Sequence, residues 1–236
     1  MVVMAAAETA QAVRIEKRKE PMMKKDKNLS CVDCGVLHCD YQNASYPEFC
    51  QTEKMTEAKR AEIMALYEDE ENNKVMKTAA EVEFEGYCKW TRVQEIVEFA
   101  KRMGFQKIGI ATCAGLIRES RILAKILRSH DFDVYSAVCK VGAVPKTDVG
   151  IDEKCSAVGK NMCNPITQAT LLNEAGTQFN IVMGLCVGHD SLFYKHAQAV
   201  TTTLVVKDRV LVHNPVMALY TADGYYSNLM EPLEDE

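Results

Sequence analysis

Two copies of one short unit constrain the fold of this chain more than any other sequence feature. The first copy is QKIGIATCAGLIRES, residues 106–120, and the second is NIVMGLCVGHDSLF, residues 180–193. Each copy has an apolar run, a cysteine after it, a glycine soon after the cysteine, and then the start of a helix. Both runs lack the polar alternation of a half-exposed strand, so we expect strands covered on both faces of a parallel sheet.

The pattern around these two units predicts an α/β domain over residues 87–222. Predicted helices alternate with the strands, and one of them begins at a capping box formed by Thr91 and Gln94. The alternation predicts a mainly parallel sheet of four to five strands with helices on both faces. The predicted strands cover residues 107–112, 133–138, 179–185 and 202–206, and residues 210–213 are a candidate antiparallel edge.

Ten cysteines among 236 residues are the unusual feature of the composition. In a secreted mini-protein they would indicate disulfides, but the apolar N-terminus lacks the preceding basic region of a secretory signal. We therefore expect a cytoplasmic protein whose cysteines serve metal or redox chemistry. The net charge of −5 gives no reason to expect nucleic acid as a partner. No membrane association is expected, because no apolar run approaches the roughly 20 residues of a membrane helix.

Four cysteines lie close together near the N-terminus, in the segment SCVDCGVLHCDYQNASYPEFC, residues 30–50. The first two form a Cys-x-x-Cys pair followed by glycine, which is typical of a turn that directs two sulfurs at one ion. Four thiolates in so short a segment suit either tetrahedral zinc or an iron–sulfur cluster. The predicted metal ligands are Cys31, Cys34, Cys39 and Cys50.

The regions outside the α/β domain divide into three segments. Residues 1–29 are predicted to form a mobile basic tail. Residues 30–86 are predicted to form a cysteine-rich head followed by a helical arm that breaks around residues 68–73. Residues 223–236 predict an acidic tail.

Four further cysteines are predicted to converge within the α/β domain. Cys113, Cys139 and Cys186 follow three separate strands, and Cys163 precedes a helix whose N-cap is Asn164. Ligands of open α/β sheets bind at the carboxyl ends of the strands, so all four thiols should approach one crevice. The competing interpretation is that each cysteine is a small buried hydrophobic residue.

Other residues of this crevice are candidates for binding or catalysis. Gly115 and Gly188 lie in turns whose N–H groups can hydrogen-bond a cluster. His189 and Lys140 directly follow Gly188 and Cys139, and they are candidate proton donors or catalytic groups. Cys155, in the long loop of residues 140–162, is a spare or alternative ligand.

The sequence resembles a family of cysteine-rich proteins, mostly from anaerobic bacteria and archaea, described as metal-binding or of unknown function. The resemblance covers residues 31–220 and implies a metal-binding head on an α/β domain, but it implies no reaction or substrate. The segments that carry it are CVDCGVLHC, PEFC, KIGIATCAGL, CKVG, MCNP, GLCVGHDSLF and HNPVMALY.

Three functions remain open from the sequence. The first is an iron–sulfur redox protein with one or two 4Fe-4S clusters, either an electron-transfer protein or an enzyme such as a reductase or sulfur-handling enzyme. Its partner would be an electron-donor protein or a small-molecule substrate. The second is an accessory protein that binds zinc or another transition metal, with zinc in the N-terminal site. The third is a nucleotide- or metabolite-binding domain with structural cysteines, which the missing G-x-G-x-x-G and P-loop sequences disfavour.

Overall fold

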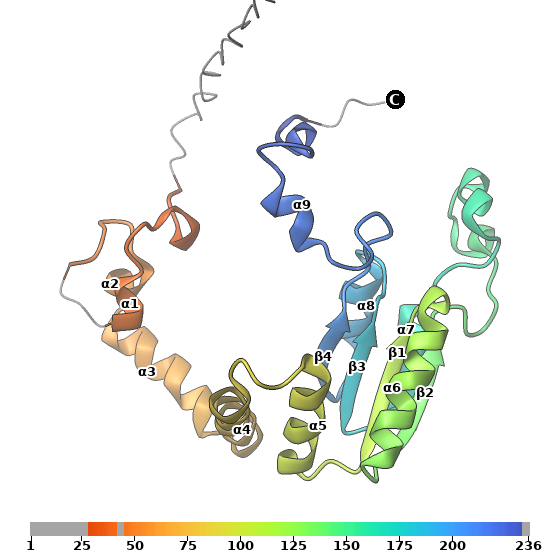
Figure 1. The fold of residues 1–236 in the computed structure, drawn as a ribbon, viewed down its shortest axis with the longest axis horizontal. Coiled ribbons are helices and arrows are strands. Elements are labelled where there is room, and N and C mark those ends of the chain that lie inside the picture. Colours follow the sequence, from red (N-terminus) through yellow and green to blue (C-terminus); the bar gives the residue numbers. More distant parts are fainter. Residues whose placement is uncertain (1–27, 42–44, 233–236) are drawn as a thin grey trace, which may run out of the picture. The chain divides into compact units, whose positions relative to one another are not determined.

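The computed structural model describes residues 28–41 and 45–232, which form two compact units. The division between the units lies between Leu66 and Tyr67. Nearly all of the predicted basic tail, residues 1–29, lies outside the described residues, as do residues 233–236 of the predicted acidic tail. Figure 1 shows the helices and strands of each unit.

The N-terminal unit consists of short helices, and local capping residues fix where two of them begin. Ser30 and Asp33 form a capping box at the first of them, and the Thr56 side chain accepts a hydrogen bond from the N–H of Lys59 at another. The helices are η1 (Cys31–Asp33), α1 (His38–Tyr41), α2 (Gln51–Lys54) and α3 (Glu57–Ala65).

The short helix η2 (Leu66–Glu68) contains the division, and the second unit continues with two longer helices, α4 (Glu70–Gly86) and α5 (Arg92–Met103). The predicted arm breaks just before α4 because the Asp69 side chain caps that helix by accepting from Asn72 N–H. Arg102 of α5 binds both carboxylate oxygens of Glu85 in α4, at 3.0 and 2.6 Å. The compact unit thus includes α4, whereas the sequence grouped residues 30–86 with the head.

The α/β fold predicted from the sequence is confirmed. The strands β1 (Lys107–Thr112), β2 (Asp133–Val138), β3 (Phe179–Met183) and β4 (Val200–Val205) form one sheet in the order β2-β1-β3-β4. Every neighbouring pair is parallel, as Figure 1 shows. All five β3 residues are buried, which explains why the strand is apolar apart from Asn180. The Asn180 Oδ1 accepts a hydrogen bond from Thr177 Oγ1 at 2.8 Å.

Helices cover both faces of the sheet. On one face, α5 and α6 (Ile117–Ser129) pack against Ile108, Ile110 and Ile181. On the other face, α7 (Pro165–Glu174) and α8 (His189–His196) pack against Ala111 and Val182. Alternate residues of β1 and β3 therefore belong to two separate cores. The remaining elements are η3 (Ala114–Leu116), η4 (Lys146–Val149), η5 (Glu153–Val158), α9 (Val216–Tyr220) and η6 (Ser227–Met230).

The prediction of an antiparallel edge strand at residues 210–213 is wrong. The Asp208 carboxylate accepts hydrogen bonds from the N–H groups of Val210 and Leu211, at 2.8 and 2.7 Å. Those N–H groups are therefore unavailable to a sheet ladder, and the segment forms turns in which Val212 and His213 have positive φ. Among the described residues, no helix is both long and apolar enough to cross a bilayer.

Candidate functional site at the carboxyl edge of the sheet

Three of the predicted site cysteines follow the carboxyl ends of adjacent strands. Cys113 comes directly after β1 and Cys139 directly after β2, while Cys186 follows β3 by a short turn. The connection from β1 to β2 runs through α6 on one face, and the connection from β2 to β3 runs through α7 on the other. The chain therefore reverses its direction across the sheet between β1 and β3, which is where α/β folds bind ligands.

Backbone hydrogen bonds beyond the strands bring the cysteine-bearing segments together. The N–H of Cys113 donates to the carbonyl of Met183 at 3.0 Å, and the N–H of Cys139 donates to Thr112 at 2.8 Å. The N–H of Asn164 donates to the carbonyl of Cys139 at 2.7 Å, which places Cys163 next to Cys139. The sheet ladder thus continues into the site and fixes three of its cysteines.

The thiols of Cys113, Cys139 and Cys163 interact directly. Hydrogen bonding to Cys139 is the main cause that lowers the pKa of Cys113 to about 5, with help from the N–H of Gly115 and from Lys207. The same partner lowers the pKa of Cys163 to about 5, aided by Lys140 and His189. The pKa of Cys139 is raised, because in its protonated form it donates to the neighbouring sulfurs and because it is buried.

Cys186 is joined to this group through Arg209. A guanidinium nitrogen of Arg209 donates a hydrogen bond to Cys186 Sγ at 3.0 Å. The pKa of Arg209 is raised first by this bond, and the nearby charges of Cys113 and Cys163 raise it further. The structure therefore brings together all four cysteines that the sequence assigned to the crevice.

The two glycines of the repeated unit differ in their role. The N–H of Gly115 faces Cys113, and the adjacent N–H of Ala114 donates to Cys139 Sγ at 3.3 Å. Gly188 is the N-cap of α8 and has a φ of 83°, so it serves the turn that starts the helix. The N–H donors expected at the site therefore come from the first copy of the unit.

The two candidate catalytic residues lie beside Cys163. Lys140 Nζ donates a hydrogen bond to the carbonyl of Asn161 at 2.6 Å, and the positive charge of Lys140 helps to lower the pKa of Cys163. The charge of His189 also helps to lower the pKa of Cys163. The Nδ1 atom of His189 is buried without a hydrogen-bond partner among the described residues. Cys155 lies in η5 of the long loop, where its backbone carbonyl accepts a hydrogen bond from Lys146 Nζ.

Sequence reasoning missed three residues that shape the site. Lys207 was predicted to start a turn and Arg209 was given no role, yet both extend to the thiols. The available signal was the position of the KDR sequence directly after the last strand of a parallel sheet. The third residue, Gln168 of α7, is fully buried and donates to the carbonyls of Thr112 and Ala137, at 3.1 and 2.7 Å.

The N-terminal cysteines occupy a more open setting. Cys31 and Cys39 are exposed, while Cys34 and Cys50 are half-buried. Cys31 and Cys34 bound a tight turn in which the N–H of Cys34 donates to the carbonyl of Cys31 at 3.2 Å. Cys50 precedes α2, and the N–H of Glu53 is the main cause that lowers its pKa.

Neither set of cysteines has the geometry of a preformed metal centre. Within residues 28–41 and 45–232, no three His, Cys, Asp or Glu side chains are grouped so that they could hold a metal ion as they stand. In the α/β unit the sulfurs instead satisfy one another by hydrogen bonds. Metal binding by Cys113, Cys139, Cys163 and Cys186, or by Cys31, Cys34, Cys39 and Cys50, stays a prediction.

Two sequence comparisons relate this chain to known proteins. The chain is 51% identical over 170 residues to the uncharacterized protein MJ0455 of Methanocaldococcus jannaschii, and the match covers 72% of this chain and 86% of that protein. Residues 50–204 match the family described as "Protein of unknown function (DUF1847)", and this range contains the four clustered cysteines. The family resemblance drawn from the sequence is thereby confirmed, and the chain belongs to the DUF1847 family.

Proposed function

We propose that the protein is a redox protein that binds an iron–sulfur cluster through Cys113, Cys139, Cys163 and Cys186. The observation that carries the proposal is the convergence of these four thiols at the reversal point of the sheet. They come from four separate chain segments and are linked by thiol hydrogen bonds and by Arg209. Four soft ligands on rigid elements are the donor set that iron–sulfur clusters require.

The charges around the thiols support this assignment. Three cations lie near the site cysteines: Lys207 helps to lower the pKa of Cys113, Lys140 helps to lower that of Cys163, and Arg209 hydrogen-bonds Cys186. Each can offset the negative charge of a thiolate-bound cluster. The N–H groups of Ala114 and Gly115 point at sulfur, which is the kind of outer contact that tunes the potential of a cluster. The residues present therefore fit the group in both ligand type and charge.

Binding a cluster requires the sulfurs to exchange their mutual hydrogen bonds for coordination. A cysteine side chain turns about one bond, so this change needs new rotamers and leaves the backbone ladder intact. When bound, the cluster would supply one-electron transfer. With only three cysteines as ligands it would leave an iron open to substrate, which a reductase or sulfur-handling enzyme needs. An electron-donor protein or a small-molecule substrate would then be the partner.

The N-terminal cysteines are proposed as a second metal site. Two observations support this: Cys31 and Cys34 lie at the two ends of a tight turn, and the lowered pKa of Cys50 favours the thiolate form that binds metal. Either a second 4Fe-4S cluster or zinc matches a set of four cysteines in a short segment.

One observation favours a second candidate, an accessory protein that binds zinc or another single ion. Cys139 contacts both Cys113 and Cys163, so three sulfurs lie close together. Such close spacing suits a single tetrahedral ion, whose ligand sulfurs are near neighbours. An iron–sulfur cubane separates its ligands more widely, because each sulfur binds a different iron.

Metal analysis of protein purified under strict anaerobiosis tests both candidates. A brown protein with about four to eight irons and matching sulfide per chain supports the cluster. A colourless protein with about one zinc at the crevice cysteines supports the accessory role. A protein that binds neither metal contradicts both.

Four variants assign the metal to its site. Cys113→Ser and Cys186→Ser should each remove the crevice metal and leave the N-terminal metal in place, whereas Cys34→Ser should do the reverse. Cys88→Ser is the matched control, because Cys88 belongs to neither set. Full metal content in both crevice variants would contradict the proposal.

A further inference from the structure

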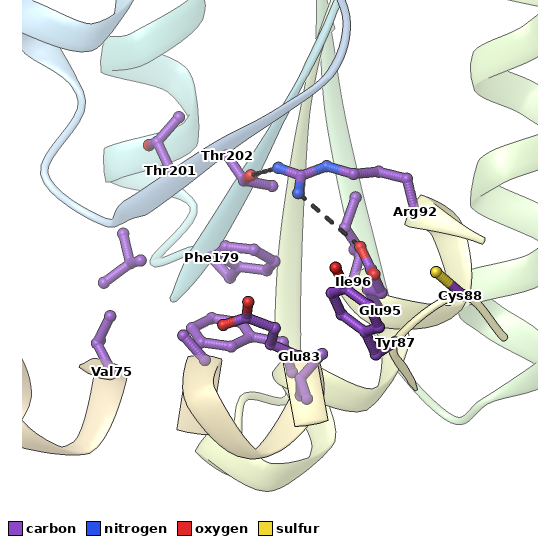
Figure 2. A pocket seen from close by; sticks show the side chains of 14 residues that line it. Val75, Glu83, Tyr87, Cys88, Arg92, Glu95, Ile96, Phe179, Thr201 and Thr202 are labelled. Carbon is purple, nitrogen blue, oxygen red and sulfur yellow. Dashed lines mark hydrogen bonds and ion pairs between the residues drawn. The ribbon is translucent and has the colours of Figure 1, made fainter. Parts of the chain in front are cut away.

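The second unit contains a cavity of about 620 Å³ at the opposite edge of the sheet from the thiols. It lies among α4, α5 and the first residues of β3 and β4, which are Phe179 and Val200. Figure 2 shows the side chains that surround it. Because the cysteines follow the carboxyl ends of the strands, this cavity is independent of the function proposed above.

The inner wall of the cavity is apolar and buried. Val82, Ile96 and Phe179 are 6%, 4% and 2% exposed, so they form a fixed surface within the fold. Phe99 and Val200 extend this surface. A volume of several hundred Å³ with a mainly apolar lining is typical of small-molecule sites.

The one cationic side chain in the described lining is already engaged. Arg92 donates to Thr202 Oγ1 at 2.9 Å and to the carbonyl of Thr203 at 3.4 Å, and it forms an ion pair with Glu95 at 4.0 Å. Figure 2 shows it reaching over the cavity to β4. Arg92 therefore holds the edge strand, and the carboxylate of Glu95 offsets its positive charge.

Of the two carboxylates in the described lining, Glu95 pairs with Arg92, and Glu83 is exposed and has no partner. Its side chain comes from α4 and is turned toward the Phe179 ring in the view of Figure 2. Across the described ranges, no hydrogen bond or ion pair engages the Glu83 carboxylate. Two carboxylates and one guanidinium line the cavity, which gives it one formal negative charge.

We propose that this cavity binds a small organic cation, an amine with an aromatic or branched aliphatic body. The body would pack on Phe179 and Phe99, and the ammonium group would pair with Glu83. Aromatic side chains favour such a ligand further, since a cation is attracted to their ring faces. Tyr87 lies at the same cavity and adds a third ring.

The proposal is tested by measuring the binding of 2-phenylethylamine to the full chain with calorimetry or ligand-observed NMR. Its neutral and anionic counterparts, 2-phenylethanol and 3-phenylpropanoate, should bind more weakly than the amine. Glu83→Gln should weaken the amine by about two- to fivefold, the range of one exposed ion pair, and leave the alcohol unchanged. Glu71→Gln, on the same helix but outside the cavity lining, should change neither.

A second variant tests the cavity apart from the charge. Ala79 lines the cavity from the exposed side of α4, so Ala79→Trp should fill the space and abolish binding of all three compounds. Circular dichroism checks that this variant is folded. The proposal is overturned if no compound binds, if the three bind equally, if Glu83→Gln leaves the affinity for the amine unchanged, or if the amine still binds to Ala79→Trp. Metal content does not enter any of these readouts.

Discussion

Arg209 donates a hydrogen bond to Cys186 Sγ at 3.0 Å, although 23 residues separate the two. The contact joins the segment after β4 to the turn after β3, and it adds a permanent cation to a group of thiols. Arg209 is exposed, so its replacement should disturb the site and leave the fold in place.

Arg209→Gln should reduce retention of a soft metal by about tenfold or more, the usual effect of losing an outer contact to a ligand. Arg209→Lys should retain more, because it keeps the charge and loses only the hydrogen-bond geometry. Metal content after dialysis against a chelator measures the effect. Arg121→Gln, an exposed position on α6, is the control, and equal retention in all variants would refute the role of Arg209.

The lowered pKa values predict selective thiol reactivity in the reduced, metal-free protein. Because the pKa of Cys113 and of Cys163 is lowered to about 5, both should react with iodoacetamide at about pH 6, where a free thiol of pKa about 8.5 is mostly protonated. Their labelling should fall as the pH drops through 5, since the thiolate is lost. Cys139, whose pKa is raised, should stay unlabelled throughout this range.

Peptide mass spectrometry across about pH 4 to 8 follows each cysteine separately, and the denatured chain gives the free-thiol profile. Cys139 has one S–H and donates to one neighbour at a time, so the first proton lost is shared between Cys113 and Cys163. Profiles that match those of the denatured chain would contradict the thiol network.

Gly184 is required by the turn that leads from β3 to Cys186. It has a φ of 64°, and a Cβ there would lie 2.2 Å from Leu116 Cδ1. Gly184→Ala should cost about 1–2 kcal/mol for the backbone conformation, and the clash should add about 1–3 kcal/mol. Gly150→Ala is the matched control, with a φ of 78° and open space around it, and urea unfolding compares the two. Equal losses would show that the clash is relieved.

Gln168 holds the strand ends that precede two of the site cysteines. Gln168→Leu leaves the buried carbonyls of Thr112 and Ala137 without its amide, which should cost about 1–3 kcal/mol in the free energy of unfolding. Faster labelling of Cys139 should accompany the loss, because the segment after β2 is loosened. Unchanged stability in urea would show that the lone buried oxygen of Gln168 already cancels the benefit of the two bonds.

The sequence determined most of the α/β framework. Strands β1 and β2 and the Thr91–Gln94 capping box lie where the pattern predicted them, because apolar runs and capping residues act over a few neighbours. The same local logic failed at residues 210–213, where β propensity indicated a strand. There the Asp208 side chain captures the N–H groups that a strand would need.

The convergence of the cysteines also followed from the sequence, because parallel strands present their carboxyl ends on one edge. Only the tertiary structure decided what surrounds them. Arg209 and Lys207 come from a segment with no local signal for a site, and Gln168 looks like an ordinary polar residue of a helix. Their roles depend on contacts between residues far apart in the chain, which no short-range pattern encodes.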